Sequence, residues 1–372
     1  MAAPSMIDPQ DQEALREAWR EMAGRRMRQR DIATALGISE ARLLGCRVGI
    51  VPAARHEHGE AGTSAPGQPT VIRLRSDLDA IRALLEGLPA LGPVMALTRN
   101  DSCVHEKDGP YRDIELAGHA GLALGVIDLR LFYRRWRHAF AVEDTSVDPP
   151  QRSLQCYLSD GEATHKVFLR PASDVSAWRA LVERLRAPEQ APGLEAETPL
   201  AIDYPLADEV DAQAFARDWL AMQDTHEFFP LLKRYGLART GALRIAPDGH
   251  ATRVGDDTVE RVLTAAAASG LSIMVFVGNP GCIQIHTGPV VRIERMGPWL
   301  NVLDPGFSLH LRSDHVRETW VVRKPTSDGI VTSLELYDEA GRLIATLFGE
   351  RKPGRPESPG WRELVSSLTE AA

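Results

Sequence analysis

His165 is the residue whose type and position point most directly to chemistry. It lies in the stretch 160–168, which recurs near the end of the chain as 339–348, and in that second copy Ala345 takes its place. A neutral imidazole can ligate iron and other metals. A duplicated scaffold with one histidine that is not duplicated therefore predicts a single site, built asymmetrically.

Three basic residues also lack a basic counterpart in the other half. Arg99 corresponds to Gly278 and Lys324 to Asp144, while Arg351 follows the last strand-like run of the second copy. Guanidinium and ammonium groups pair with carboxylates, so they suit the polar edge of a flat, apolar ligand. Judged by residue type and spacing alone, structural roles stay the alternative for all of these residues.

The two halves of the chain carry one sequence pattern, and this repeat sets the expected architecture. Identities stay in register at an offset of 179 around residues 95–114 and of 180 around residues 129–168, and Trp19 matches Trp219 at an offset of 200. We expect two homologous domains, residues 1–187 and 205–372. A segment at 188–204, rich in Pro, Ala and Glu, is the expected linker.

Each half is expected to begin with helices, continue with strands and end on a helix. Short β-branched runs such as 273–277 and 331–337 are separated by turn signals such as 278–281. Strands follow strands without intervening helices, which favours antiparallel sheets. The expected fold is α+β: an internal duplication in which each domain has an antiparallel sheet flanked by helices.

Composition argues against a membrane protein, and missing motifs weaken, without excluding, the case for the common enzyme classes. The 372 residues carry a formal net charge of −8 and no apolar run long enough to cross a bilayer, so we expect a cytoplasmic protein without membrane insertion. The four cysteines have no CxxC spacing, which is typical of reduced core residues. The sequence contains no HExxH, GxSxG, phosphate-loop or GxGxxG motif.

One segment imitates a DNA-binding helix-turn-helix. Residues 30–43 have the pattern of a helix, a glycine turn and a second helix. The second half carries the same unit at 228–243 without that signature, so a module repeated for packing is the simpler interpretation. DNA is not an expected partner.

Several long motifs resemble the HemS/HmuS family of bacterial haem-utilisation proteins. In the second half these are 274–279 (MVFVGN), 281–285 (GCIQI), 297–302 (GPWLNV), 307–311 (FSLHL), 323–329 (RKPTSDG) and 332–336 (TSLEL); in the first half they are 36–41, 98–100 and 164–166. The resemblance covers almost the whole chain. It implies one haem as ligand, held in a cleft between the two halves.

The resemblance also implies a role for each matching residue. His165 would ligate the haem iron and Arg99 would lie on the opposite, distal side, with Phe276 lining the pocket. Lys324 and Arg351 would meet the haem propionates or the polar edge of the pocket. Thr346 and Phe348 stand where relatives tend to have glutamine and tyrosine, which puts the hydrogen bonds of those two positions in doubt.

Two functions fit this resemblance. The first is a haem carrier for iron acquisition, which takes haem from an inner-membrane importer and passes it to a haem oxygenase or another haem protein. The alternative is a haem-degrading enzyme that opens the porphyrin with O₂ and reductant, with Arg99 as the candidate distal residue. A helix-turn-helix regulator is a distant third. The sequence contains no motif for binding a reductant.

Overall fold

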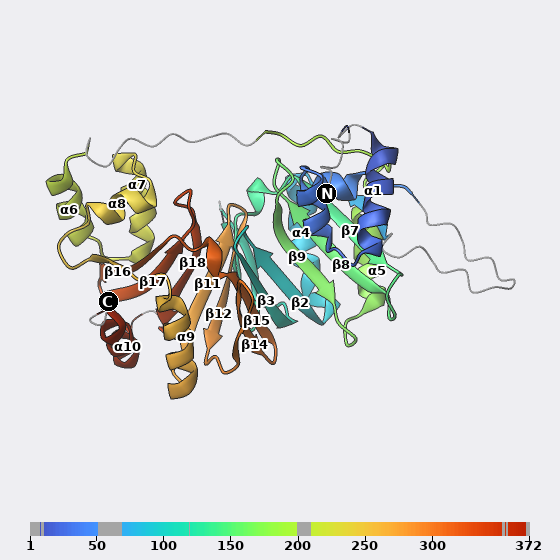
Figure 1. The fold of residues 1–372 in the computed structure, drawn as a ribbon. Coiled ribbons are helices and arrows are strands. Elements are labelled where there is room, and N and C mark those ends of the chain that lie inside the picture. Colours follow the sequence, from blue (N-terminus) through green and yellow to red (C-terminus); the bar gives the residue numbers. More distant parts are fainter. Residues whose placement is uncertain are drawn as a thin grey trace, which may run out of the picture. The chain divides into compact units, whose positions relative to one another are not determined.

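The computed structural model describes residues 8, 11–50, 69–118, 120–198, 210–351, 354 and 356–369 (Figure 1). The chain divides into two compact units. Unit 1 holds the described residues of Met1–Thr98, Asp108–Pro199 and Asn279–Cys282, and unit 2 those of Arg99–Lys107, Leu200–Gly278 and Ile283–Ala372. The expected linker at 188–204 ends among residues outside the described part, so its boundaries stay a prediction.

The fold is α+β and duplicated, as expected, and its strands form two nine-stranded antiparallel sheets. The helices of unit 1 are α1 (Gln12–Gly24), α2 (Gln29–Ala35), α3 (Glu40–Gly45), α4 (Leu78–Gly87) and α5 (Val175–Leu185). Its main strands are β1 (Thr70–Leu74), β2 (Pro93–Arg99), β4 (Ile114–Ala117), β5 (Ala120–Ala123), β6 (Asp128–Leu131), β7 (His138–Asp144), β8 (Gln151–Tyr157) and β9 (Ala163–Leu169).

Unit 2 repeats this order of elements. Its helices are α6 (Ala212–Leu220), the 3₁₀ turn η4 (Thr225–Glu227), α7 (Phe228–Tyr235), α8 (Arg239–Arg244), α9 (Thr258–Ser269) and α10 (Pro359–Thr369). Its main strands are β3 (Cys103–Pro110), β10 (Ala251–Val254), β11 (Ile273–Asn279), β12 (Cys282–Gly288), β13 (Ile293–Met296), β14 (Trp299–Asp304), β15 (Phe307–Arg312), β16 (Glu318–Thr326), β17 (Gly329–Tyr337) and β18 (Leu343–Gly349).

In unit 1 the strand run β1-β7-β8-β9-β2 separates two apolar cores. Side chains alternate between the faces of a strand, so Leu154 and Cys156 of β8 pack with α4 and α5, whereas Tyr157 packs with α1, α2 and α3. Unit 2 is built in the same way around β10-β16-β17-β18-β11. There Leu334 packs with α9 and α10, and Tyr337 packs with α6, α7 and α8.

The helix-turn-helix segment of unit 1 forms, but its second helix is buried. Glu40, Ala41, Leu43, Leu44 and Gly45, five of the six residues of α3, are buried against the rest of the unit. A recognition helix must present its side chains to the major groove, so this arrangement supports the packing interpretation over DNA reading. None of the described helices is long and apolar enough to cross a membrane.

Matched glycines in the β-turns after β8 and β17 give a direct test of the repeat. Gly161 (φ +82°) and Gly341 (φ +71°) both lie in the left-handed region, where an L-residue costs about 1–2 kcal/mol. A Cβ on Gly161 would lie 2.1 Å from the Oγ of Ser39, the N-cap of α3, whereas one on Gly341 would lie 3.0 Å from the Oγ1 of Thr240. We therefore expect Gly161→Ala to lower the urea midpoint clearly more than Gly341→Ala, and equal losses would contradict the described turn packing.

Candidate functional site

Three of the predicted pocket residues lie on one face of the unit 2 sheet. Phe276 of β11 pairs in register with Thr346 of β18, and the rings of Phe276 and Phe348 are 5.1 Å apart at 68°. The intervening residues, such as Val275 and Leu347, enter the core beneath α9 and α10. Phe276, Thr346 and Phe348 therefore face the opposite side, where both phenylalanine rings stay partly exposed.

The predicted basic residues also belong to unit 2. Lys324 of β16 is 4% exposed and Arg99, at the end of β2, is 7% exposed. Arg351 directly follows β18 and is half-buried. Its charge helps to lower the pKa of Asp224, so the guanidinium lies near the turn that connects α6 to α7. Six of the seven predicted residues are thus in one unit.

His165 is the exception, because it lies in the core of unit 1. Its Nδ1 is 2.8 Å from the Oγ1 of Thr98, its Nε2 is 2.5 Å from the hydroxyl of Tyr111, and its ring stacks on Trp136 with centroids 6.3 Å apart. Only 3% of the residue is exposed, and burial lowers its pKa to about 3. Both ring nitrogens are engaged, so iron ligation by His165 would require the Tyr111 contact to open.

Another histidine, His226, lies in unit 2 and has the features of a metal ligand. This residue was not predicted from the sequence. It lies in η4 with its side chain 90% exposed, and its Nδ1 is 2.6 Å from a carboxylate oxygen of Asp224. Asp224 also accepts the backbone N–H of His226, which is the main cause of the lowered pKa of this carboxyl. Nε2 has no hydrogen-bond partner among the described residues. A carboxylate on one imidazole nitrogen that leaves the other nitrogen for the metal is the usual support of a histidine ligand.

The signal that selected His165 applies to His226 as well. At the offset of 200 that aligns the openings of the halves, His226 corresponds to Arg26 (226 − 200 = 26), so it too has no histidine counterpart. The sequence Asp224-Thr225-His226 also places a carboxylate two residues before the imidazole. That spacing favours a hydrogen bond from the backbone N–H of His226 to the Asp224 carboxylate, which keeps the carboxylate close to the imidazole.

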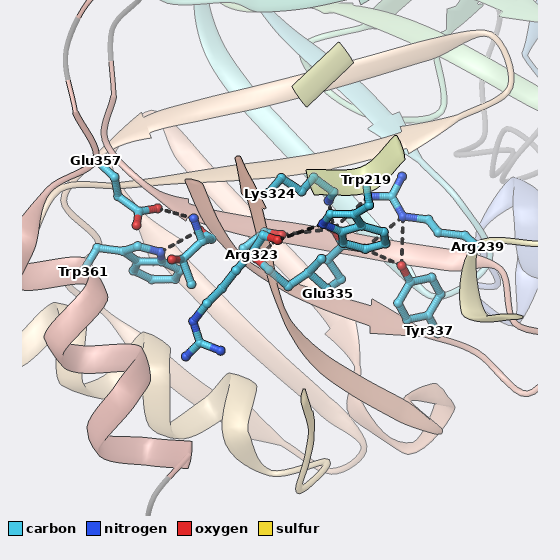
Figure 2. Close-up of polar contacts among 11 residues, drawn as sticks. Trp219, Arg239, Arg323, Lys324, Glu335, Tyr337, Glu357 and Trp361 are labelled. Carbon is cyan, nitrogen blue, oxygen red and sulfur yellow. Dashed lines mark hydrogen bonds and ion pairs between the residues drawn. The ribbon is translucent and has the colours of Figure 1, made fainter. Parts of the chain in front are cut away.

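Unit 2 also contains a buried polar cluster that is centred on Glu335 (Figure 2). Glu335 of β17, which is fully buried, accepts hydrogen bonds from Arg239 at 2.8 and 2.9 Å and from the Nζ of Lys324 at 2.6 Å. Burial alone would raise the pKa of Glu335, but the two cations hold it well below its usual range. Burial lowers the pKa of Lys324 to about 8, against the opposing effect of Glu335.

This cluster contacts Phe228, the first residue of α7, which lies close in sequence to Asp224 and His226. The Nζ of Lys324 lies 4.5 Å from the ring centroid of Phe228, and the guanidinium carbon of Arg239 lies 5.2 Å from it. Phe228 is 2% exposed and stands two residues after His226. Fold and site together define a duplicated α+β protein whose unit 2 carries an exposed, carboxylate-supported imidazole, an aromatic sheet face and several cations.

Comparison with known proteins identifies the family. The model of the haemin-degrading HemS.ChuX domain matches residues 59–185 and again residues 236–368. The chain therefore belongs to the HemS/ChuX family and contains two copies of its domain. Among the residues that the structure describes, no group of three or more His, Cys, Asp or Glu side chains is arranged to hold a metal ion by itself.

Individual relatives match over nearly the whole chain. The hemin transport protein HmuS of Yersinia pestis is 40% identical over 344 residues, covering 91% of this chain and 92% of HmuS. The crystal structure of holo-PhuS, a heme-binding protein from Pseudomonas aeruginosa, is 45% identical with a TM-score of 0.88, covering 97% of this chain and 99% of PhuS. ChuS, a heme degrading enzyme of Escherichia coli O157:H7, is 35% identical with a TM-score of 0.84, covering 96% and 99%.

The buried state of His165 predicts a pH dependence of stability. Its pKa is about 3 in the folded protein and near 6.5 in an unfolded chain, so the unfolded state alone takes up a proton between these values. The stabilising contribution is complete above about pH 6.5 and is lost as the pH falls, by at most about 1.4 kcal/mol per pH unit. Urea unfolding between pH 7.5 and 5 should show a shallower loss in His165→Gln than in the wild type. Parallel curves would mean that His165 is already protonated or exposed in the folded protein.

Proposed function

We propose that the chain binds one haem on unit 2 and carries it after uptake as part of iron acquisition. The single observation that carries this proposal is the gathering on one unit of a carboxylate-supported, exposed imidazole with the aromatic face of Phe276 and Phe348. Iron ligation, a flat apolar surface and cations for carboxylates are what haem requires of a protein. The haem-binding and hemin-transport relatives support the same ligand.

His226 is the better candidate for the iron ligand, and His165 is the alternative. The Nε2 of His226 is exposed and its imidazole is oriented by Asp224, whereas Nε2 of His165 already contacts Tyr111 in a closed core. Six of the residues that the resemblance assigns to the pocket share unit 2 with His226 and not with His165. Arg99 is proposed as the distal residue of the same site.

Lys324 and Arg351 are proposed to meet the haem propionates. Lys324 carries a positive charge at neutral pH because its pKa is about 8, and Arg351 lies near Asp224. Thr346 keeps a hydroxyl on the sheet face, but Phe348 offers no polar group where relatives tend to have tyrosine. We therefore expect Phe348 to contribute apolar contact with the macrocycle rather than a propionate hydrogen bond.

Haem degradation is the second candidate function, favoured by the similarity to ChuS. When bound, haem would supply the O₂ chemistry, and this chain would contribute the imidazole, the distal cation and an apolar face that limits access of water. The two functions are separated by incubating the haem complex with ascorbate and catalase. A carrier leaves the Soret band intact, whereas an enzyme bleaches it and yields a defined tetrapyrrole. The carrier proposal includes an inner-membrane haem importer as the donor, a haem oxygenase or another haem protein as the acceptor, and a cytoplasmic location.

A hemin titration of variants distinguishes the two histidines. We expect the wild type to saturate at one haem per chain, and His226→Ala to bind at least tenfold more weakly with a changed ferric Soret band, because the iron loses its ligand. His165→Ala should lower stability but keep the spectrum. Arg351→Ala should weaken binding but retain the spectrum, because it removes a partner of the haem propionates and leaves the iron ligand in place.

The opposite pattern would contradict the assignment. A normal spectrum in His226→Ala together with an altered one in His165→Ala would place the ligand in unit 1. Wild-type binding without a defined stoichiometry would contradict haem binding itself.

A further inference from the structure

The buried polar cluster of unit 2 has a counterpart in unit 1 in which the charges are exchanged. At the offset of 180, Glu335 corresponds to Gln155, and Tyr337 and Ser333 correspond to Tyr157 and Ser153. Tyr157 donates to the Oε1 of Gln155 at 2.6 Å, and Gln155 donates to Ser153 at 3.0 Å. Tyr337 likewise donates to one carboxylate oxygen of Glu335, whereas Ser333 donates to the other at 3.0 Å, the reverse of the direction between Gln155 and Ser153.

The helix residues around these strands are exchanged too. In each unit, the first residue of one helix takes part in the cluster. This residue is Glu40 of α3 in unit 1 and Arg239 of α8 in unit 2. Likewise α2 begins with Gln29, which bonds Glu40, whereas α7 begins with Phe228, which packs against two cations.

The lysines of the two clusters come from strands that do not correspond in the repeat, and the two clusters differ in net charge. In unit 1 Lys166 of β9 forms a buried ion pair with Glu40, one cation with one carboxylate. In unit 2 Lys324 of β16 and Arg239 share the single carboxylate of Glu335. Within these two clusters, unit 1 is balanced and unit 2 carries one positive charge in excess. A buried excess charge is costly unless geometry and hydrogen bonds hold it in place.

Glu335 is the group that holds the excess positive charge of unit 2 in place. Five donor atoms converge on its two oxygens: two from Arg239 and one each from Lys324, Ser333 and Tyr337. The ring of Phe228 lies within 5.2 Å of both cationic groups, and its quadrupole attracts them. Because Phe228 directly follows η4, this arrangement fixes the start of α7 and the turn that presents His226.

We propose that Glu335 is a positioning residue for ligand binding: it keeps Lys324 charged and in place, and through Phe228 it fixes the segment that carries His226. This inference rests on the haem-binding function proposed above. The unit 1 counterpart, with Gln155 at this position and its one cation, Lys166, neutralised by Glu40, cannot do the same. The exchange of Gln155 for Glu335 is thus what confines the cationic side of the site to one copy of the repeat.

Glu335→Gln tests the proposal with two readouts. The charged groups that face Lys324 are Glu335 of β17 and Arg239 of α8, so loss of the carboxylate leaves only a repelling cation and lowers the lysine's affinity for a proton. Hemin binding at pH 7 should weaken roughly tenfold, and its alkaline fall should begin at a lower pH than in the wild type. In the ligand-free protein, ¹³C-lysine NMR assigned with Lys324→Met should show Lys324 titrating at least one pH unit lower.

Glu40→Gln is the matched control, since it removes the buried carboxylate of the unit 1 cluster. It should lower stability while leaving the alkaline limb of hemin binding and the titration of Lys324 unchanged. Should Glu335→Gln not fold, Glu335→Asp keeps the charge on a shorter side chain, and it should weaken binding while the alkaline limb stays at the wild-type pH.

An unchanged Lys324 titration in Glu335→Gln, or an alkaline limb displaced in Glu335→Asp, would overturn the positioning role. If the wild type did not bind hemin at all, the proposed function would fail. The lysine titration of the ligand-free protein would still decide whether Glu335 keeps Lys324 charged.

Discussion

One buried, desolvated carboxylate, that of Glu335, sets the local geometry of unit 2 around the candidate site. It is fully buried and is held ionised by Arg239 and Lys324. A buried carboxylate is tolerated only when its oxygens are fully hydrogen-bonded, and here strands β16 and β17 and helix α8 all contribute to that requirement. The position of α8 and the start of α7 follow from it, because Phe228 packs on the two cations.

The duplication explains how one chain can build two similar units and a single candidate site. Both units place three helices on one face of a five-strand run and two on the other, with the same alternation of core residues. The difference lies in polar residues at matched positions, where Gln155 and Glu40 give way to Glu335 and Arg239. In unit 1 the polar core is closed, and His165 belongs to it through Thr98 and Tyr111.

The sequence predicted the fold, because the fold depends on signals that recur along the chain, whereas the roles of the individual site residues stay predictions. Repeat identities and apolar alternation predicted the α+β duplication, and the resemblance predicted the residues that the structure gathers on unit 2. The special role given to His165 stays a prediction without geometric support, since absence from one copy of a repeat does not reveal burial. A core histidine bonded to Thr98 and Tyr111 and an exposed one bonded to Asp224 look alike until their neighbours are placed. The charge exchange at Glu335 could be recognised only once the helices were aligned with the strands, and the change of offset from 200 at the openings of the halves to 180 along the strands concealed it.

The central claim is that His226 on unit 2 is the imidazole that meets the metalloporphyrin. The most direct measurement is a titration of ¹⁵N-histidine-labelled protein with gallium protoporphyrin IX, a diamagnetic substitute for haem, with signals assigned from His226→Asn and His165→Asn. The account predicts that the Nε2 resonance of His226 shifts by tens of ppm at one equivalent while the signals of His165 stay in place. A shift confined to His165, with His226 unchanged, would contradict it.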